Sequence, residues 1–195
     1  MFKAVRISIL LFVLFFVSVS TWLTQARSTD WNNSLWVKVY PINGEIRYYH
    51  GLILLQNGQR EQGLAELRAA IELEPRLLAP RRLMASELLG LRQHAAAAEQ
   101  MEAVLALEPD DLYTLVTFAT YLAQYGDDSG RARELIARAD RLAPQDPSVI
   151  DGRAWLAYLA GDRATARRIV EQGGRYYENE PLFLQRRQRI LQVAP

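Results

Sequence analysis

The sequence contains no cysteine, which excludes disulfide bonds, thiolate metal ligands and cysteine nucleophiles. Lysine is scarce as well, because Lys3 and Lys38 stand beside 21 arginines in a chain of 195 residues. Histidine occurs only at His50 and His94, and neither lies in an HExxH motif or a histidine-rich cluster. We expect a packed or hydrogen-bonded His50 and a solvated His94 in a turn between helices.

Sequence motifs for the common kinds of catalysis are also missing. The chain has no GxGxxG, no GxxxxGK[ST] and no GxSxG. The acid pairs at 110–111 and 127–128 lack EF-hand spacing and are typical of helix caps and turns. We therefore predict a protein without enzyme activity, metal ion, cofactor or small-molecule substrate.

Charge is unevenly distributed along the chain. Residues 1–27 carry three basic residues and no acid, so the remainder holds 20 basic and 22 acidic residues, a net charge of −2. A phosphate-binding surface needs a basic excess on one face. This balance argues against a nucleic-acid partner.

A run of 20 residues without charge, 7–26, follows Lys3 and Arg6. As a helix it would span about the ~30 Å hydrocarbon layer of a bilayer. We predict that residues 1–27 form a short cytoplasmic tail and a transmembrane anchor, with the body exported. The alternative is a signal peptide cleaved after Ala26, although the run exceeds the usual apolar length of such peptides. The anchor residues named in this prediction are Ile7, Leu10, Phe12, Phe15, Phe16 and Trp22.

The segment 28–44 is predicted to be an extended juxtamembrane connector. Its part 34–40, SLWVKVY, alternates in a strand-like way, and Pro41 and Asn43-Gly44 then interrupt it. Its tryptophans would favour the headgroup layer or pack on the body that follows.

Three similar phrases recur further along the chain: AAIELEP at 69–75, AVLALEP at 103–109 and RADRLAP at 138–144. Their spacing of 34 and 35 residues is a period of helical repeat proteins. Small residues stand at positions 8 and 20 of the units, and a larger apolar residue stands at position 24. Position 11 holds leucine in the first three units and Ala157 in the fourth, and glycine stands near position 15. Proline stands at position 32 in the first three units, and that of the fourth is displaced to Pro181. The units begin at Gly44, Leu78, Leu112 and Pro147.

This pattern resembles the tetratricopeptide repeat (TPR) family over about residues 44–180. The resemblance implies pairs of antiparallel helices, in which small residues permit close approach and stacked units share a core. It departs from the family at Arg92, which replaces glycine at position 15, and at Gly63 and Gly173, where alanine is usual. We predict an all-α TPR solenoid of about four repeats over 45–195.

The segment EPLFLQRRQRILQ, 180–192, is expected to be one further helix with a polar outer face. Repeat solenoids need such a terminal cap, and capping is the favoured interpretation. A basic helix that binds a partner independently is the alternative.

The TPR resemblance implies that the first helices of successive units line a concave groove, chiefly through positions 2, 5, 9, 12 and 13. Tyr48, Arg82, Trp155 and Tyr158 are the strongest candidates, because such side chains dominate binding hot spots. For each aromatic the alternative is packing between units. The Lys/Asn set that clamps a C-terminal carboxylate in some relatives is missing. The full set predicted is Tyr48, Leu52, Gln56, Arg82, Ser86, Val116, Thr120, Gln124, Asp151, Trp155 and Tyr158.

Together these features predict a single-pass adaptor in the bacterial inner membrane, with its body in the periplasm. The bacterial setting is favoured by the arginine and alanine bias, which is typical of GC-rich genomes. The adaptor would bind membrane or periplasmic proteins during assembly or maturation of a membrane complex, and its N-terminal helix would contact the lipid bilayer. The alternatives are a permanent structural subunit of a large membrane complex and a support for an enzyme of the cell wall.

Overall fold

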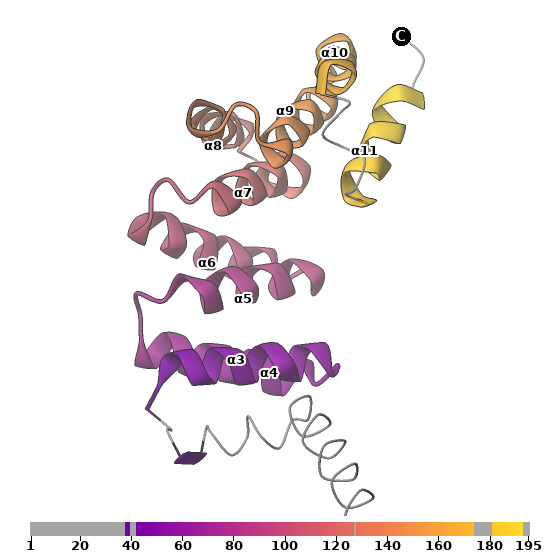
Figure 1. Ribbon diagram of the computed structural model, residues 1–195. Coiled ribbons are helices and arrows are strands. Elements are labelled where there is room, and N and C mark those ends of the chain that lie inside the picture. The colour runs from indigo at the N-terminus through magenta and orange to yellow at the C-terminus, as the bar shows by residue number, and fades with distance from the viewer. Residues whose placement is uncertain (1–37, 40–41, 127, 174–180, 193–195) are drawn as a thin grey trace, which may run out of the picture. The chain divides into compact units, whose positions relative to one another are not determined.

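The structure, a computed structural model, describes residues 38–39, 42–126, 128–173 and 181–192, with only the backbone of 181–183. Between residues 44 and 192 the described part of the chain forms nine α-helices (Figure 1). They are α3 (Gly44–Gln56), α4 (Arg60–Leu73), α5 (Leu78–Gly90), α6 (His94–Leu107), α7 (Leu112–Tyr125), α8 (Ser129–Leu142), α9 (Pro147–Leu159), α10 (Arg163–Gly173) and α11 (Pro181–Gln192).

The predicted anchor, 1–27, and most of the predicted connector, 28–44, lie outside the described residues. Lys38 and Val39 are described, and both have helical backbone conformation. Of the helices that the structure describes, none combines the length and the apolar character that crossing a bilayer requires. The anchor and the connector therefore remain predictions.

The period read from the sequence is the period of the helices. The first helices of the four units begin at the predicted unit starts, 34, 34 and 35 residues apart. The second helices, α4, α6, α8 and α10, begin 34, 35 and 34 residues apart, so the extra residue of the third unit lies between α7 and α8. The predicted pairing of helices is confirmed.

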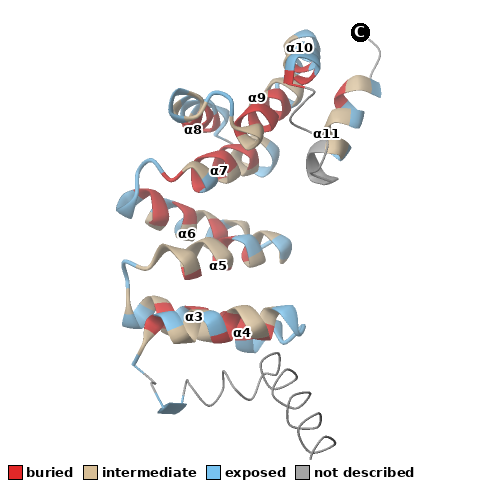
Figure 2. Ribbon diagram, in the orientation of Figure 1, coloured by how far each residue is buried: buried red, intermediate tan, exposed pale blue. Residues whose placement is uncertain are grey.

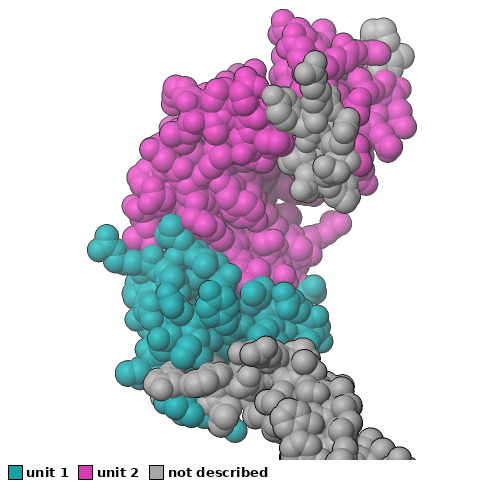
Figure 3. Space-filling model, in the orientation of Figure 1, with its two compact units in different colours: residues 1–80 teal, residues 81–195 magenta. Residues whose placement is uncertain are grey.

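The chain divides into two compact units, residues 1–80 and 81–195 (Figure 3). In the first unit, α3 packs against α4 along a glycine contact. A Cβ atom placed on Gly51 would lie 3.0 Å from the carbonyl oxygen of Gly63, and the reverse distance is also 3.0 Å. Real Cβ atoms rarely tolerate such contacts, so these two backbones approach more closely than alanine would allow. This explains why residue 63, at position 20 of the first repeat, is glycine where alanine is usual.

In the second compact unit, residues 81–195, alanines take the repeat positions that these glycines have in the first. The residues at positions 8 and 20 are buried, and so are the larger side chains at position 24. Figure 2 colours the buried residues of these helices red. Burying one such aliphatic side chain contributes about 1.5–3 kcal/mol. The pairs are Ala85 with Ala97, Ala119 with Ala132 and Ala154 with Ala166, and the larger side chains at position 24 are Met101, Ile136 and Val170.

Aspartate and asparagine side chains begin most of the helices. Asp111 accepts a hydrogen bond from the Thr114 amide, and Asp128 accepts one from the Arg131 amide. Each bond satisfies a backbone donor that the first helical turn leaves free. The prediction that the acid pairs cap helices is confirmed for these two residues. The side chains of Asn43 and Asp146 cap α3 and α9 in the same way.

The turn between the helices of a pair needs a left-handed residue in three of the four units. Gly58 and Gly161 have φ of 79° and 82°, and Arg92 occupies the equivalent place with φ of 58°. The hydrogen bonds are equivalent as well, because Gln93 donates to the Leu88 carbonyl as Gln59 donates to that of Leu54. Arg92 therefore adopts a conformation that glycine adopts without steric cost.

The last helix, α11, packs against α9 and α10. Its Ile190 is buried in a cluster with Ala154, Trp155, Ala166 and Val170. α11 begins 34 residues after α9, so it occupies the register of a first helix in a fifth unit. At position 8 of that register, where a second helix would need a small residue, it carries the exposed Gln188. A polar residue at this position fits the capping interpretation.

Replacing Arg92 with glycine should stabilise the second repeat, which consists of α5 and α6. The change removes the steric cost of a side chain on a left-handed backbone. The greater freedom of glycine in the unfolded chain offsets part of this, so we expect the free energy of unfolding to rise by about 0.5–1 kcal/mol. Urea unfolding followed by circular dichroism measures this gain as a higher midpoint.

Arg92→Ala is the matched control, since it removes the guanidinium but keeps Cβ. An equal gain in both variants would show that side-chain charge, and not backbone strain, governs this position. Gly161→Ala, at the equivalent turn, should lose stability.

Candidate protein-binding groove

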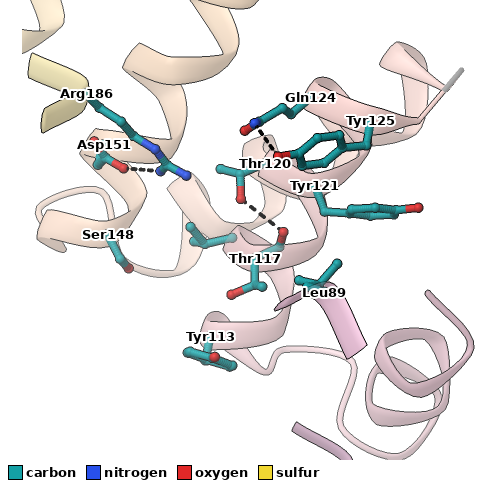
Figure 4. A pocket seen from close by; sticks show the side chains of 11 residues that line it. Leu89, Tyr113, Thr117, Thr120, Tyr121, Gln124, Tyr125, Ser148, Asp151 and Arg186 are labelled. Carbon is teal, nitrogen blue, oxygen red and sulfur yellow. Dashed lines mark hydrogen bonds and ion pairs between the residues drawn. The ribbon is translucent and has the colours of Figure 1, made fainter. Parts of the chain in front are cut away.

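A pocket of about 440 Å³ lies along α7 in the second unit, and we call it the α7 groove (Figure 4). Helix α7 supplies most of its wall, and α5, α9 and α11 supply the rest. Two of its tyrosines, Tyr113 and Tyr125, are 52% and 60% exposed. The lining residues are Leu89, Tyr113, Val116, Thr117, Thr120, Tyr121, Gln124, Tyr125, Ser148, Asp151 and Arg186.

Aromatic stacking fixes one side of the groove. The His94 ring stacks on Tyr125 with centroids 4.9 Å apart and on Tyr121 with centroids 5.5 Å apart. Gln124 Nε2 donates a 2.7 Å hydrogen bond to the Tyr125 hydroxyl. The expectation of a solvated His94 in a turn is wrong, because this residue begins α6 and packs against two rings of α7. It anchors the tyrosines instead.

A buried ion pair closes the opposite side. Asp151, on α9, is only 2% exposed, and its Oδ2 accepts a 2.5 Å hydrogen bond from Arg186 Nη1 on α11. The same guanidinium lies over the Trp155 ring, 5.1 Å from its centroid, so it makes a cation–π contact as well. Burial raises the pKa of Asp151, and the charge and hydrogen bond of Arg186 oppose this rise in part.

Arg82, one of the strongest candidates from the sequence, forms an ion pair with Asp111 inside the second compact unit. Its Nη2 donates to Asp111 Oδ2, while Asp111 Oδ1 accepts from the Thr114 amide at 2.9 Å. Asp111 therefore caps α7 and also ties this helix to α5. Replacing Arg82 would disturb the placement of α7 as well as any contact with a partner.

Three residues of the predicted set lie in the first compact unit, residues 1–80. Tyr48 and Leu52 are half-buried, and Gln56 is exposed at the end of α3. Tyr48 contacts Tyr49 with ring centroids 5.0 Å apart. His50 is buried with its Nδ1 3.5 Å from Glu66 Oε1, so the expectation of a packed or hydrogen-bonded histidine is confirmed.

In the second compact unit, residues 81–195, several predicted residues line the α7 groove and others lie outside it. Val116, Thr120, Gln124 and Asp151 line the groove. Ser86 is exposed on α5 and does not line it. Trp155 is 4% exposed and stacks on Tyr158 with centroids 5.2 Å apart, which matches the packing alternative for these two aromatics. Binding by the predicted residues remains a prediction.

Some lining residues were missed by the sequence reasoning. Tyr113 stands at position 2 of the third unit, so the repeat register contained the signal for it. Tyr121 and Tyr125 face the groove because the His94 ring orients them. Arg186 comes from α11, outside the repeats, and only the fold brings it to Asp151.

Metal chemistry finds no support in the described part of the chain. Among those residues, no group of three or more histidine and carboxylate side chains converges on a point that could hold an ion. The groove offers hydroxyls, an amide and aromatic rings, which suit recognition of a protein segment.

Comparison with known proteins identifies the fold. No protein-family profile matches the sequence. A TPR repeat-containing protein of Pseudomonas aeruginosa is 31% identical over 131 residues, which cover 65% of this chain and 22% of that protein. The chain thus spans about a fifth of the length of this curated relative.

Solved structures agree on the architecture. A tetratricopeptide repeat protein from Parabacteroides merdae superimposes with a TM-score of 0.73 at 14% identity, covering 83% of this chain and 64% of its own. Pseudomonas aeruginosa PilF gives a TM-score of 0.63 at 20% identity, covering 76% of this chain and 68% of its own. The chain has a TPR-like, all-α solenoid fold. The predicted fold class is confirmed to this extent.

Asp111 should contribute to stability through two separate bonds. Asp111→Ala removes the cap of α7 and the Arg82 pair, and we expect a loss of about 1–3 kcal/mol. Asp111→Asn keeps a capping oxygen and should lose less. Urea unfolding of both variants measures the difference, and equal losses would contradict a separate capping contribution.

Replacing Arg186 with glutamine should create a pH-dependent loss of stability. Without the guanidinium the buried carboxylate of Asp151 is uncompensated, so we expect the variant to lose about 3 kcal/mol near neutral pH, less if α11 detaches. The folded pKa of Asp151 then lies still further above its ordinary value. The stability linked to this group is present below the unfolded pKa and is lost as pH rises through the folded pKa.

The loss relative to wild type should therefore shrink as the pH falls toward the ordinary pKa of aspartate. Thermal unfolding of both chains across this range measures the difference. Arg189→Gln, an exposed arginine of the same helix, is the control with the same charge change. A loss independent of pH would contradict the role assigned to Asp151.

Proposed function

We propose that this chain is a membrane-anchored adaptor whose repeats bind a segment of another envelope protein. The observation that carries the proposal is the α7 groove, which presents exposed tyrosines beside hydroxyl and amide groups. Tyrosine supplies large contact area at low entropic cost, and polar groups between the rings fix the orientation of a bound chain. The partner class is a protein segment, since this surface offers no cluster of basic side chains.

The dimensions of the groove fit a short stretch of peptide. A volume of about 440 Å³ accommodates a few side chains rather than a whole folded domain. Thr117, Gln124 and Ser148 line it and can exchange hydrogen bonds with the backbone of an extended peptide. Apolar side chains of that peptide would lie against Leu89 and the tyrosine rings.

The proposed location is the bacterial inner membrane, with the repeats on the periplasmic side. The support is the uncharged run 7–26 with Lys3 and Arg6 before it. A tether confines the repeats to the membrane plane and raises their effective concentration toward other membrane proteins. Such an adaptor suits assembly or maturation of a membrane complex.

A photo-crosslinking residue at position 113 tests this function. Tyr113 is exposed in the groove, so benzoylphenylalanine preserves an aromatic ring at this place. After irradiation of native membranes, we expect one dominant adduct with an envelope protein. The same residue at position 137, exposed on α8 outside the groove lining, is the control.

The adduct should weaken severalfold when Tyr125 is replaced by alanine. Adducts of equal yield at both positions, or none at position 113, would contradict binding in the groove. An adduct partner that copurifies one to one and resists high salt would instead favour a permanent structural subunit.

A further inference from the structure

Three tyrosines of the same helix line the α7 groove. Tyr113, Tyr121 and Tyr125 belong to α7, and the first and last of them are more than half exposed (Figure 4). The His94 ring stacks on Tyr121 and Tyr125, and Gln124 donates a hydrogen bond to the Tyr125 hydroxyl. These contacts restrict two of the rings before a partner arrives, which lowers the entropic cost of binding.

We propose that the segment bound in the α7 groove is proline-rich and adopts the polyproline II conformation. This inference rests on the proposed function, because it names the kind of segment that the adaptor binds in that groove. Grooves lined with aromatic rings suit such segments, whose backbone is already extended and loses little entropy on binding. The exposed tyrosine rings of α7 provide these aromatic faces.

The accessible polar groups of the groove are suited to donate hydrogen bonds. The Tyr125 hydroxyl accepts from Gln124 Nε2 at 2.7 Å, which leaves its own proton for another acceptor. Gln124 has a second N–H on the same nitrogen, and Tyr113 and Thr117 add two hydroxyls. Asp151, the only carboxylate among the lining residues, is 2% exposed and already ion-paired. The groove therefore offers a partner several donors and no accessible carboxylate.

A proline-rich segment matches this set of donors. Each of its residues offers a carbonyl oxygen, whereas proline has no N–H to donate. Polyproline II has no internal hydrogen bonds, so those carbonyls stay available to the groove. A segment without proline would bring an N–H at every residue, and an N–H buried unpaired against the tyrosine rings costs free energy. The donors of the groove thus favour a proline-rich partner.

The spacing of the tyrosines sets the length of a segment that lies along α7. Tyr113 and Tyr125 are twelve residues apart on this helix, which corresponds to about 18 Å at ~1.5 Å per residue. A polyproline II chain rises about 3.1 Å per residue, so roughly six residues span the two rings. A short proline-rich stretch is therefore long enough to contact both exposed tyrosines.

A second copy of this chain is not the expected source of the segment. The eight prolines of the sequence include no two adjacent residues. The nearest pair, Pro144 and Pro147, leads into α9, where Asp146 caps the helix. The expected source is therefore a proline-rich segment of another protein.

The test compares two labelled peptides on the full chain in mild detergent. One is fluorescein-labelled decaproline. The other is a fluorescein-labelled peptide of the same length with alternating alanine and serine, which has an N–H at every residue. Fluorescence anisotropy should show that decaproline binds about tenfold more tightly than the control peptide.

Tyr113→Ala and Tyr125→Ala should each weaken decaproline binding about fivefold, since each removes an exposed ring of the groove. Tyr125→Phe keeps the ring and removes the hydroxyl donor, so its loss should be smaller. Tyr49→Ala is the matched control, because Tyr49 is 56% exposed but belongs to α3, outside the groove lining. Circular dichroism of each variant verifies its helical content before titration.

The crosslinking residue at position 113 separates this inference from the proposed function. Mass spectrometry of the adduct identifies the partner residue joined to benzoylphenylalanine, and we expect it in a proline-rich segment. An adduct with an envelope protein on a segment without proline would overturn the inference and support the proposed function. Decaproline binding in the groove without any adduct at position 113 would contradict the proposed function alone.

Equal affinity for the two peptides would overturn the inference. Decaproline binding that both Tyr113→Ala and Tyr125→Ala leave unchanged would overturn it as well, because the peptide would then bind elsewhere. An adduct between two copies of this chain would refute another protein as the source of the segment.

Discussion

The close approach of the two helices in each pair is the constraint on which the rest of the structure depends. A glycine or alanine at position 8 meets another at position 20 in all four pairs, and these residues are buried. Because the backbones lie close together there, the next side chains along each helix interlock instead of holding the helices apart. In the first pair the approach is so close that a Cβ atom on Gly51 or Gly63 would meet the opposing carbonyl oxygen at 3.0 Å.

This constraint leaves the other faces of the first helices available for function. In α7 the small Ala119 points toward α8, and the tyrosines of the same helix line the groove. The ends of the helices are held by capping aspartates, and Asp111 extends its role through an ion pair with Arg82. Local signals thus position a surface that side chains from several helices complete.

One buried charge connects the last repeat with the helix that follows it. Asp151 lies among apolar side chains of α9, and Arg186 compensates it from α11. A buried ion pair stabilises little on balance but makes its geometry specific, since either partner alone is costly. The pair thereby links the wall of the α7 groove to the presence of α11.

The sequence by itself determined the period, the starts of the four units and the small residues between paired helices. These follow from spacing along the chain, because each pair is a local structure whose residues lie within one repeat. The positions of Thr120, Gln124 and Asp151 in the α7 groove were also available from the register. Position 15 of the second unit was recognised as unusual, although only the backbone shows that Arg92 adopts the left-handed conformation.

The tertiary structure decided which of the positions predicted to be exposed are covered by side chains of other helices. Trp155 and Asp151 have the register of groove residues, yet α11 lies over the first and pairs with the second. His94 has the position of a turn residue, yet Tyr121 and Tyr125 of α7 stack against its ring. These contacts join residues from different helices, and no periodic pattern records them, because burial depends on which helix arrives from elsewhere in the chain.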